Sequence, residues 1–286
     1  MTKLALLGAA GQIGTPLSLL AKSSDLFDEI SLYDLVHTPG IATDLNHIDT
    51  RAKVSGFLAK DGGLTKALES ADIVVVTAGI ARKPAAEALK KGGAFDPTRL
   101  FGVTSLDVVR ASTFISHALG GNIDPKSFKV PVIGGHSGAT ILPLYSRSEP
   151  RVDIDSEALA KAVHSTDPGV QFGGDEIVQS KQGAGSATTC MAYAGFRFVK
   201  ALLAARAGEA VTEEAYVYLP GIPGGKEIAA RLGVDYFAVK IALGASGATK
   251  ALDFGNISEN EQKLLEVALK DLGVNIQDGQ AFGASK

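Results

Sequence analysis

The sequence is poor in cysteine. Cys190 is the single cysteine among 286 residues, so no intrachain disulfide can form. One thiol also falls short of the cysteine cluster that a structural zinc site uses, and we expect no metal site. Because disulfides are common in secreted proteins, this composition favours a reducing compartment over an extracellular one.

Long apolar runs and blocks of basic residues are missing as well. The longest apolar runs, such as residues 73–79 and 130–135, are far shorter than the roughly 20 residues that a membrane-spanning helix needs. The net charge is −3, the isoelectric point is about 6.0, and the 28 lysines and arginines form no basic block. We therefore expect neither a membrane nor a nucleic acid as a partner.

No targeting signal is evident at either end of the sequence. The first ten residues run directly into a glycine turn, without a separate charged and apolar leader. The last four residues, Gly-Ala-Ser-Lys, differ from the Ser-Lys-Leu signal of peroxisomal proteins. These features favour a cytoplasmic location, with an organellar location as the alternative.

Glycine, by contrast, is abundant. It accounts for 33 of the 286 residues, whereas an average protein has about 7% glycine. This surplus predicts many tight turns. The chain is long enough for one large domain or two domains of moderate size.

Short apolar runs rich in β-branched residues alternate with segments of helical periodicity in the first part of the chain. This alternation predicts an α/β fold with a doubly wound parallel sheet. Ser258 and Glu261 stand three residues apart, as in a capping box, and predict the start of the last helix. The expected strands are 3–7, 30–33, 72–77, 130–134, 141–145, 215–219 and 236–242, and the expected helices are 13–21, 64–69, 85–91, 106–118, 186–205 and a final one after 258.

The segment GAAGQIG lies between the first expected strand and the first expected helix. Glycine is so common here that the spacing alone is weak evidence, and an ordinary tight turn is the simpler reading. The position between strand and helix favours a turn that binds the pyrophosphate of a dinucleotide, because small residues let it reach backbone N–H groups. The residues expected to bind the cofactor are Gly8, Ala9, Gly11, Gln12, Ile13, Gly14 and Asp34.

Asp34 favours NAD over NADP as the cofactor. It follows Gly14 by twenty residues, at the end of the second expected strand. A carboxylate in this place can accept hydrogen bonds from both ribose hydroxyls, whereas it would repel a 2′-phosphate. The alternative is that Asp34 is only a turn residue at a strand end.

Several longer motifs resemble one known family. They are LYDLVHTPGIATDLNHI, TAGIARKP, FGVTSLDVVRA, VPVIGGHSGATILPL and GAGSATTCMAYAGFRF, in this order along nearly the whole chain. Together with GAAGQIG they resemble NAD-dependent malate dehydrogenase of the mitochondrial or peroxisomal type. The resemblance implies interconversion of malate and oxaloacetate, a step of the tricarboxylic acid cycle. It also implies a Rossmann NAD-binding domain at 1–104, an α+β substrate domain at 105–286 and a homodimer.

Without the resemblance, the polar residues of these motifs have ordinary explanations. Asp107 and Arg110 are three residues apart and share a helix face, which is typical of a surface ion pair. His136 lies in a glycine-rich turn after an apolar strand, where a solvated loop histidine is common. A lone arginine such as Arg82 is most often a surface cation, and a methionine at helical spacing, such as Met191, is most often a core residue.

The resemblance assigns these residues to a catalytic site. His136 matches the proton carrier, a role that suits the one side chain whose charge ordinarily changes near neutral pH. Asp107 matches the carboxylate that orients the histidine ring, and Arg110 matches the residue that binds the C1 carboxylate of the substrate. Arg82 matches the arginine that binds the second carboxylate, and Met191 a residue near the nicotinamide.

The sequence also departs from the family. After Pro84 it continues almost directly into AEALKKGGAFDPTRLFGVT, and it contains no Asn-Pro dipeptide. In the family the stretch that is missing here carries a carbonyl-polarising arginine, part of a mobile lid, and an interior strand with its helix. We therefore expect a parallel sheet that is one strand short, lower stability and impaired turnover.

Other functions stay open at this point. A non-catalytic NAD-binding or partner subunit would bind the cofactor and dimerise without turnover. A dehydrogenase of another 2-hydroxy acid would result if the shortened loop admits bulkier substrates, although Arg82 argues against it. An incomplete gene model or an alternative transcript would also produce the gap.

Overall fold

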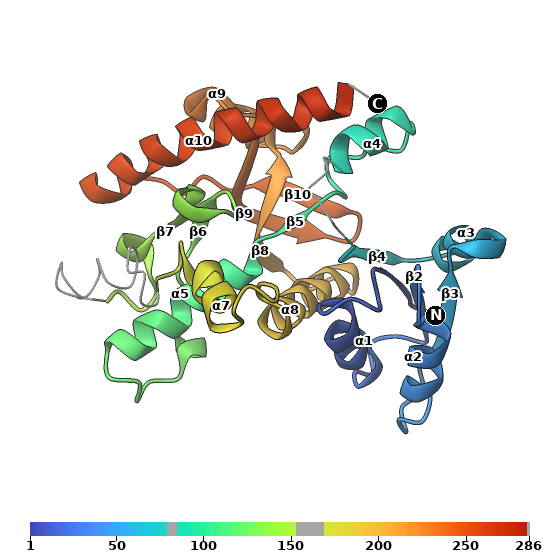
Figure 1. The fold of residues 1–286 in the computed structure, drawn as a ribbon. Coiled ribbons are helices and arrows are strands. Elements are labelled where there is room, and N and C mark those ends of the chain that lie inside the picture. The colour runs from blue at the N-terminus through green and yellow to red at the C-terminus, as the bar shows by residue number, and fades with distance from the viewer. Residues whose placement is uncertain (79–84, 153–168, 285–286) are drawn as a thin grey trace. The chain divides into compact units, whose positions relative to one another are not determined.

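The computed structural model describes residues 1–78, 85–152 and 169–284. The chain forms two compact units, which are shown in Figure 1 and are described separately. Unit 1 consists of Met1–Arg82 and Ala187–Val199, and unit 2 of Lys83–Ser186 and Lys200–Lys286. This division assigns residues 83–104 to unit 2, whereas the boundary expected from the sequence lies at residue 104. That boundary stays a prediction.

Unit 1 contains a parallel sheet, in agreement with the α/β class predicted from the sequence. Its strands are β1 (Lys3–Leu7), β2 (Glu29–Asp34), β3 (Lys53–Leu58) and β4 (Ile73–Val76), in the order β3-β2-β1-β4. The central strands β1 and β2 are more deeply buried than β4, because a central strand of a sheet with crossover helices is covered on both faces. Leu4, Leu6, Ile30 and Leu32 are completely buried.

Helices connect these strands. They are α1 (Gly14–Lys22), α2 (Thr38–Leu45) and α3 (Gly63–Leu68), to which unit 1 adds the first part of α8 (Thr189–Arg206). A buried lysine fixes the end of α1: the Lys22 ammonium donates hydrogen bonds to the carbonyl oxygens of Thr50 and Ala52, at 2.8 and 2.7 Å. Since a buried charge requires such partners, these bonds tie α1 to the segment before β3.

Among the described residues the parallel sheet has four strands. A doubly wound sheet of six strands that is one strand short would have five. The next strand in the chain, β5 (Gly102–Val103), pairs antiparallel with Tyr216 and Ala215 of unit 2 instead. Among the described residues, β4 pairs with β1 alone. The side chains of Val74 and Val76 on β4 are 46% and 63% exposed. The sheet therefore ends in an apolar edge without the charged or proline residues that usually protect edges.

We expect this edge to promote self-association. An exposed apolar edge strand offers unpaired backbone groups and β-branched side chains to other chains. Val74→Lys and Val76→Lys should reduce the formation of species larger than a dimer, measured by light scattering over a concentration series. The control is Val267→Lys, which changes a valine that is 52% exposed on a helix of unit 2. Equal effects of all three changes would contradict a specific role of the β4 edge.

In the part of the chain that the structure describes, unit 2 contains an antiparallel sheet of six strands in the order β5-β8-β9-β6-β7, with β10 paired to β9. The longest strands are adjacent, and helices cover the sheet (Figure 1). Besides β5, its strands are β6 (Val132–Gly134), β7 (Ile141–Pro143), β8 (Val211–Tyr218), β9 (Tyr236–Gly244) and β10 (Gly247–Ala251). The described helices of this unit are α4 (Ala85–Lys91), α5 (Ser105–Ala118), α7 (Gly173–Ser180), the end of α8, α9 (Gly225–Leu232) and α10 (Glu259–Ala284).

The helix α5 packs its apolar face on β6 and β7. Val108, Ala111 and Ile115 of α5 belong to one buried cluster with Val132 of β6 and Ile141 of β7. Burial of these side chains fixes the rotation of α5 about its axis, because an amphipathic helix turns its apolar stripe to the core. The first turn of α5 is thereby placed beside the end of β6.

The predicted capping box at the start of α10 is confirmed. The Ser258 N–H donates to Glu261 Oε2 at 2.8 Å, and the Glu261 N–H donates to Ser258 Oγ at 3.3 Å. The same carboxylate accepts a hydrogen bond of 3.0 Å from the Ser146 N–H. Glu261 is buried, so the cap also attaches α10 to the segment that follows β7.

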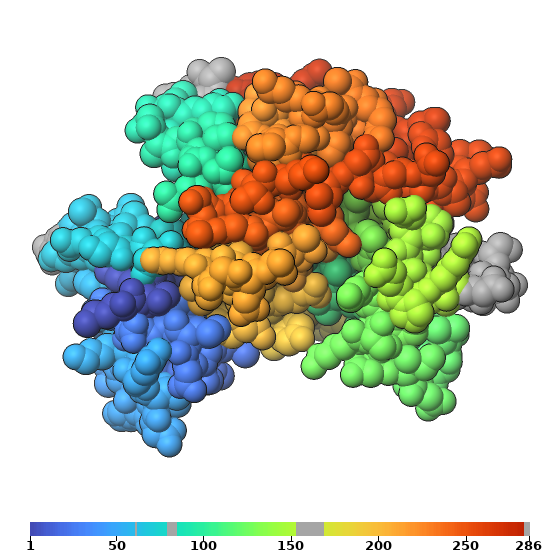
Figure 2. Space-filling view, turned by 180° about the vertical axis from the view of Figure 1, so that it is seen from behind, coloured from blue at the N-terminus to red at the C-terminus, as the bar shows by residue number. Residues whose placement is uncertain are grey.

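Lys90, which lies among aromatic rings, connects α4 to strand β8 of the same unit. Lys90 Nζ lies 5.2 Å from the ring centre of Phe95 and 5.4 Å from that of Tyr218. It also lies 2.7 Å from Glu87 Oε1, and this hydrogen bond raises the pKa of Lys90 above its ordinary value. Figure 2 shows the teal segment that contains α4 beside the orange segment that follows β8. The cation–π contact between Lys90 and Tyr218 thus holds α4 against β8.

Candidate active site

The glycine turn after β1 has the geometry of a dinucleotide-binding loop. Gly8 has φ +86°, and its N–H donates to Tyr33 O at 2.9 Å. A Cβ at Gly8 would lie 2.4 Å from Ala78 N, and one at Gly14 would lie 2.1 Å from Gly8 O. Both positions therefore require glycine, because a side chain would collide with backbone atoms.

The N-terminus of α1 follows this turn and offers free backbone donors. α1 begins at Gly14, and Gln12 and Ile13 precede it. Within the described residues, the N–H groups of Gln12 and Ile13 have no protein acceptor. Free N–H groups at a helix N-terminus are suited to a phosphate group. Ala9 is completely buried under the loop, so it supports the turn.

Asp34 lies at the carboxyl end of β2, beside the same turn. Its Oδ2 accepts a hydrogen bond of 2.9 Å from the Ala10 N–H, and its Oδ1 accepts one of 2.7 Å from the Leu35 N–H. These bonds fix the carboxylate while each oxygen keeps a lone pair for another donor. The side chain is half-buried, which leaves it accessible to the hydroxyls of a ribose.

The two glycines Gly11 and Gly14 should respond differently to alanine. Gly14→Ala is expected to lower the melting temperature strongly, because its Cβ meets Gly8 O at 2.1 Å. A Cβ at Gly11 meets Gly8 O only at 3.2 Å, so Gly11→Ala should keep the stability within about 1 kcal/mol and weaken NADH binding by obstructing the pyrophosphate. Thermal unfolding and NADH fluorescence titration measure the two effects. Equal losses of stability in both variants would argue against this assignment.

Two further residues expected at the site are Arg82 and Met191. Arg82 lies outside the described residues, as do its neighbours in 79–84. Met191 lies in the first turn of α8, in unit 1, and its side chain is half-buried. Its place near the nicotinamide stays a prediction.

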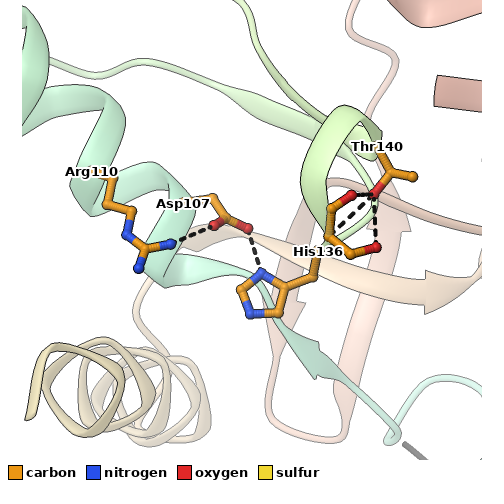
Figure 3. Close-up of polar contacts among 5 residues, drawn as sticks. Asp107, Arg110, His136 and Thr140 are labelled. Atoms are coloured by element: carbon orange, nitrogen blue, oxygen red, sulfur yellow. Dashed lines mark hydrogen bonds and ion pairs between the residues drawn. The ribbon is translucent and has the colours of Figure 1, made fainter. Parts of the chain in front are cut away.

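The structure brings His136 and Asp107 together, as Figure 3 shows. His136 Nδ1 lies 2.6 Å from Asp107 Oδ2. The Asp107 side chain is 0% exposed, whereas that of His136 is 36% exposed. Asp107 lies in the first turn of α5, where the helix dipole stabilises a carboxylate. The ring is thus held at Nδ1 by a buried acceptor.

Arg110 joins the pair from the next turn of α5. Its Nη1 lies 3.7 Å from Asp107 Oδ1, and its side chain is 11% exposed. This burial excludes the surface ion pair that the spacing alone suggested. Among the described residues, buried Arg110 Nη2 and Asp107 Oδ1 have no hydrogen-bond partner. Because buried polar groups are rarely left unsatisfied, the free guanidinium donor is suited to a substrate carboxylate.

A glycine at the start of α7 leaves room for this guanidinium. A Cβ at Gly173 would lie 3.3 Å from Arg110 Nε. The arginine therefore packs against the backbone at the start of α7. A role for Gly173 could not be predicted, because nothing in the sequence shows that α7 passes beside Arg110.

The turn that carries His136 depends on Thr140, which sequence analysis also missed. The turn runs from the end of β6 to the short 3-10 helix Gly138–Thr140. Thr140 Oγ1 donates to Ser137 O at 2.7 Å and accepts from the Ser137 N–H at 3.2 Å. A threonine three residues after a serine in a glycine-rich turn is a weak sign of such bonds, and it was present in GGHSGATILPL.

Two findings concern other kinds of site. None of the helices in the described residues has the length and apolar character needed to cross a membrane. The described residues contain no group of three or more histidine, cysteine or acidic side chains suited to a metal ion.

Comparison with family models identifies both parts of the chain. Residues 2–102 match the NAD binding domain of lactate/malate dehydrogenase, and residues 104–283 match the alpha/beta C-terminal domain of the same family. The resemblance seen in the sequence motifs and the expectation of NAD as cofactor are thereby confirmed, as is the expected oxidoreductase class.

Individual relatives support the same conclusion. The chain is 39% identical to mitochondrial malate dehydrogenase of Caenorhabditis elegans, over 98% of this chain and 90% of the relative. It is 38% identical to the human mitochondrial enzyme, over 98% of this chain and 91% of the relative. These names give no support to the cytoplasmic location expected from the N-terminal sequence, and they favour the organellar alternative.

Solved structures share the fold. A malate dehydrogenase of Picrophilus torridus matches with a TM-score of 0.78 and 21% identity, over 99% of each chain. Malate dehydrogenase of Plasmodium falciparum in complex with NADH matches with a TM-score of 0.76 and 21% identity, over 98% of this chain and 99% of the other. At this level of identity the likeness concerns the fold.

The alignment also shows that this chain is shortened. The match to the Caenorhabditis elegans protein extends over 324 positions, whereas this chain has 286 residues. At least 38 aligned positions, the difference between these lengths, therefore lie opposite gaps in this chain. Despite this shortening, both domain models match in order and almost end to end, and the chain belongs to the lactate/malate dehydrogenase family.

Proposed function

We propose that this protein is an NAD-dependent malate dehydrogenase in which His136 carries the proton. The observation that carries the proposal is the 2.6 Å contact between His136 Nδ1 and buried Asp107, with Arg110 beside it. A histidine held at Nδ1 by a carboxylate presents its other nitrogen, Nε2, for proton transfer. The malate dehydrogenases among the relatives support malate and oxaloacetate as the substrates.

The proposed reaction moves one proton and one hydride. In malate oxidation, His136 Nε2 accepts the proton of the C2 hydroxyl while the hydrogen on C2 leaves as hydride. The glycine turn and Asp34 would hold NAD, which would supply the hydride acceptor. In oxaloacetate reduction, protonated His136 returns its proton to the carbonyl oxygen. Asp107 stabilises the imidazolium in both directions, because its buried carboxylate lies against Nδ1.

Two arginines are proposed to bind the substrate carboxylates. Arg110 binds the C1 carboxylate through its unsatisfied guanidinium nitrogen, and a planar guanidinium can hold two oxygens at once. Arg82 binds the second carboxylate and selects a dicarboxylate over lactate. Support for the role of Arg82 comes from the TAGIARKP motif alone.

The shortened chain is proposed to turn over slowly. In the sequence, the gap follows Pro84, where a carbonyl-polarising arginine and part of a lid are missing by resemblance. Loss of one such donor costs about 2.7 to 4 kcal/mol of transition-state stabilisation, or roughly 10²- to 10³-fold in rate. Cofactor binding should be affected less, because the glycine turn and Asp34 are intact in unit 1.

One preparation tests these proposals together. NADH binding is measured by fluorescence titration, and oxaloacetate-dependent NADH oxidation is measured on the same sample. Binding with slow turnover that is lost in His136→Asn would support an impaired malate dehydrogenase. Turnover at the usual rate of enzymes, about 10 s⁻¹ or faster, would contradict the impairment. Turnover that survives His136→Asn would contradict the assigned proton carrier.

The gap favours one second candidate, a non-catalytic NAD-binding or partner subunit. This candidate requires NADH binding and association with a copy or a homologue, without any oxaloacetate-dependent oxidation. A panel of 2-oxo acids would distinguish a dehydrogenase of another 2-hydroxy acid, which should prefer a monocarboxylate.

We propose a homodimer in an organelle as the native form, on the basis of the family resemblance and of the mitochondrial relatives. Sedimentation velocity and localisation of the tagged protein test these two points.

A further inference from the structure

We propose that the hydroxyl of Thr140 is the element that positions the His136 ring on Asp107. This inference rests on the proposed function in one respect, since it concerns the proton carrier of that reaction. It assigns Thr140 a positioning role, exerted through the backbone of the turn. The close-up in Figure 3 shows Thr140 on the side of the turn that is opposite to the ring of His136.

The contacts of Thr140 close the turn around His136 on both sides. On the C-terminal side, Oγ1 donates to Ser137 O at 2.7 Å and accepts from the Ser137 N–H at 3.2 Å. On the N-terminal side, the carbonyl oxygen of Thr140 accepts a hydrogen bond of 2.7 Å from the Gly135 N–H. His136 is the one residue between these two anchored neighbours, so its backbone direction is set by Thr140.

The surrounding atoms allow little rearrangement. A Cβ at Gly135 would lie 2.4 Å from Thr140 Oγ1 and 2.9 Å from Leu272 Cδ2 of α10. A Cβ at Gly134, which has φ +104°, would lie 2.1 Å from Thr140 O. The Thr140 side chain is itself 2% exposed. The turn is thus packed between Thr140 and α10, and Thr140 Oγ1 also lies 3.5 Å from Ser137 Oγ.

The hydroxyl is required for a physical reason. A valine at position 140 would have the shape of threonine but could neither accept from the Ser137 N–H nor donate to Ser137 O. Ser137 O would keep one bond, from the Thr140 N–H at 3.0 Å, whereas the Ser137 N–H would have no acceptor in the turn. The residue that follows His136 would then be held less firmly, and the 2.6 Å contact between the ring and Asp107 would loosen.

Thr140→Val and Thr140→Ser test the proposal. Because misplacement of a reacting group by about 1 Å can cost about 10²-fold in rate, Thr140→Val should lower kcat for oxaloacetate reduction by roughly 10- to 100-fold. The KM for oxaloacetate and the Kd for NADH should change less than about twofold, since Arg110 and the glycine turn are untouched. Thr140→Ser keeps the hydroxyl and should restore kcat to within about threefold of the unchanged protein.

Histidine ring spectra supply a readout that needs no turnover. In protein with ¹⁵N-labelled histidine, the Nδ1–H signal of His136 is assigned by its absence in His136→Asn. This signal should be lost or broadened in Thr140→Val and kept in Thr140→Ser. It decides the inference even when the unchanged protein has no dehydrogenase activity, an outcome that would overturn the proposed function alone.

A matched control separates positioning from general destabilisation. Thr113→Val makes the same change on α5, where the hydroxyl donates to Val109 O at 2.8 Å within the helix. It should leave kcat and the His136 signal unchanged. If Thr140→Val does not fold, Thr140→Cys replaces it, because the thiol is a weak donor in a smaller side chain. An unchanged kcat and ring signal in the valine or cysteine variant, or equal losses in the serine variant, would overturn the proposal.

Discussion

Asp107→Asn is expected to lower oxaloacetate reduction and malate oxidation by about 10²- to 10⁴-fold, the range that general acid–base catalysis contributes. The Asp107 carboxylate is 0% exposed and lies 2.6 Å from His136 Nδ1. An asparagine in its place can donate to Nδ1 through its amide nitrogen, which leaves the proton on Nε2 and makes the ring unable to accept one. It also cannot stabilise the imidazolium by charge. Steady-state rates in both directions measure the loss.

The control for this variant is Asp124→Asn, which makes the same chemical change at another place in unit 2. Asp124 accepts a hydrogen bond of 2.9 Å from the Lys126 N–H and caps a short 3-10 helix. Its replacement should leave the rates within about twofold, because surface changes away from the site have small effects. NADH binding should be unchanged in both variants. Malate oxidation that persists in Asp107→Asn would show that His136 does not depend on this carboxylate.

Arg110→Gln is expected to raise the KM for oxaloacetate by about 100-fold or more. Hydrogen bonds to charged groups contribute about 1.5 to 3 kcal/mol each, and a guanidinium can make two of them with one carboxylate. The donors are already in place, because Arg110 is packed against Gly173 and its Nη2 has no partner among the described residues. Glutamine loses the charge and the two parallel donors. Initial rates over a range of oxaloacetate concentrations measure the change.

Two further variants make this result specific. Arg110→Lys keeps the charge without the planar fork, so it should recover only part of the affinity. Arg231 lies on α9 and forms two hydrogen bonds with the Asp253 carboxylate, at 2.8 and 3.0 Å. Arg231→Gln should therefore leave the KM for oxaloacetate unchanged. A KM that stays within about threefold in Arg110→Gln would exclude Arg110 from carboxylate binding.

Much of the fold could be predicted from the sequence, because most elements of unit 1 follow local rules, although α2 and β3 were not expected. The apolar runs at 3–7, 30–33 and 72–77 became the strands Lys3–Leu7, Glu29–Asp34 and Ile73–Val76. The pairing of strands is not local. β5, in the segment LFGVT, was not among the expected strands, and it pairs with β8, more than 100 residues away in the sequence. Strand pairing depends on which edges are free after packing, and this information is absent from any single segment.

The site shows the same division. The glycine turn and Asp34 could be assigned from their place between strand and helix, because phosphate binding needs small residues at a helix start. The His136 and Asp107 pair could not be derived from spacing, since 29 residues separate them. At the level of sequence, only the resemblance to the family connects these two residues. Thr140 and Gly173 were missed because their roles arise from atoms that lie close in space.

The sequence by itself determined the class of fold, the dinucleotide turn and the family, because these depend on the order of residues along short segments. The tertiary structure decided that Asp107 is completely buried against His136, and that Arg110 is buried rather than part of a surface ion pair. It also decided that, among the described residues, β4 is an edge strand of the parallel sheet. Burial and pairing are properties of the packed chain, since they depend on which distant segments exclude water from a side chain or supply a strand partner.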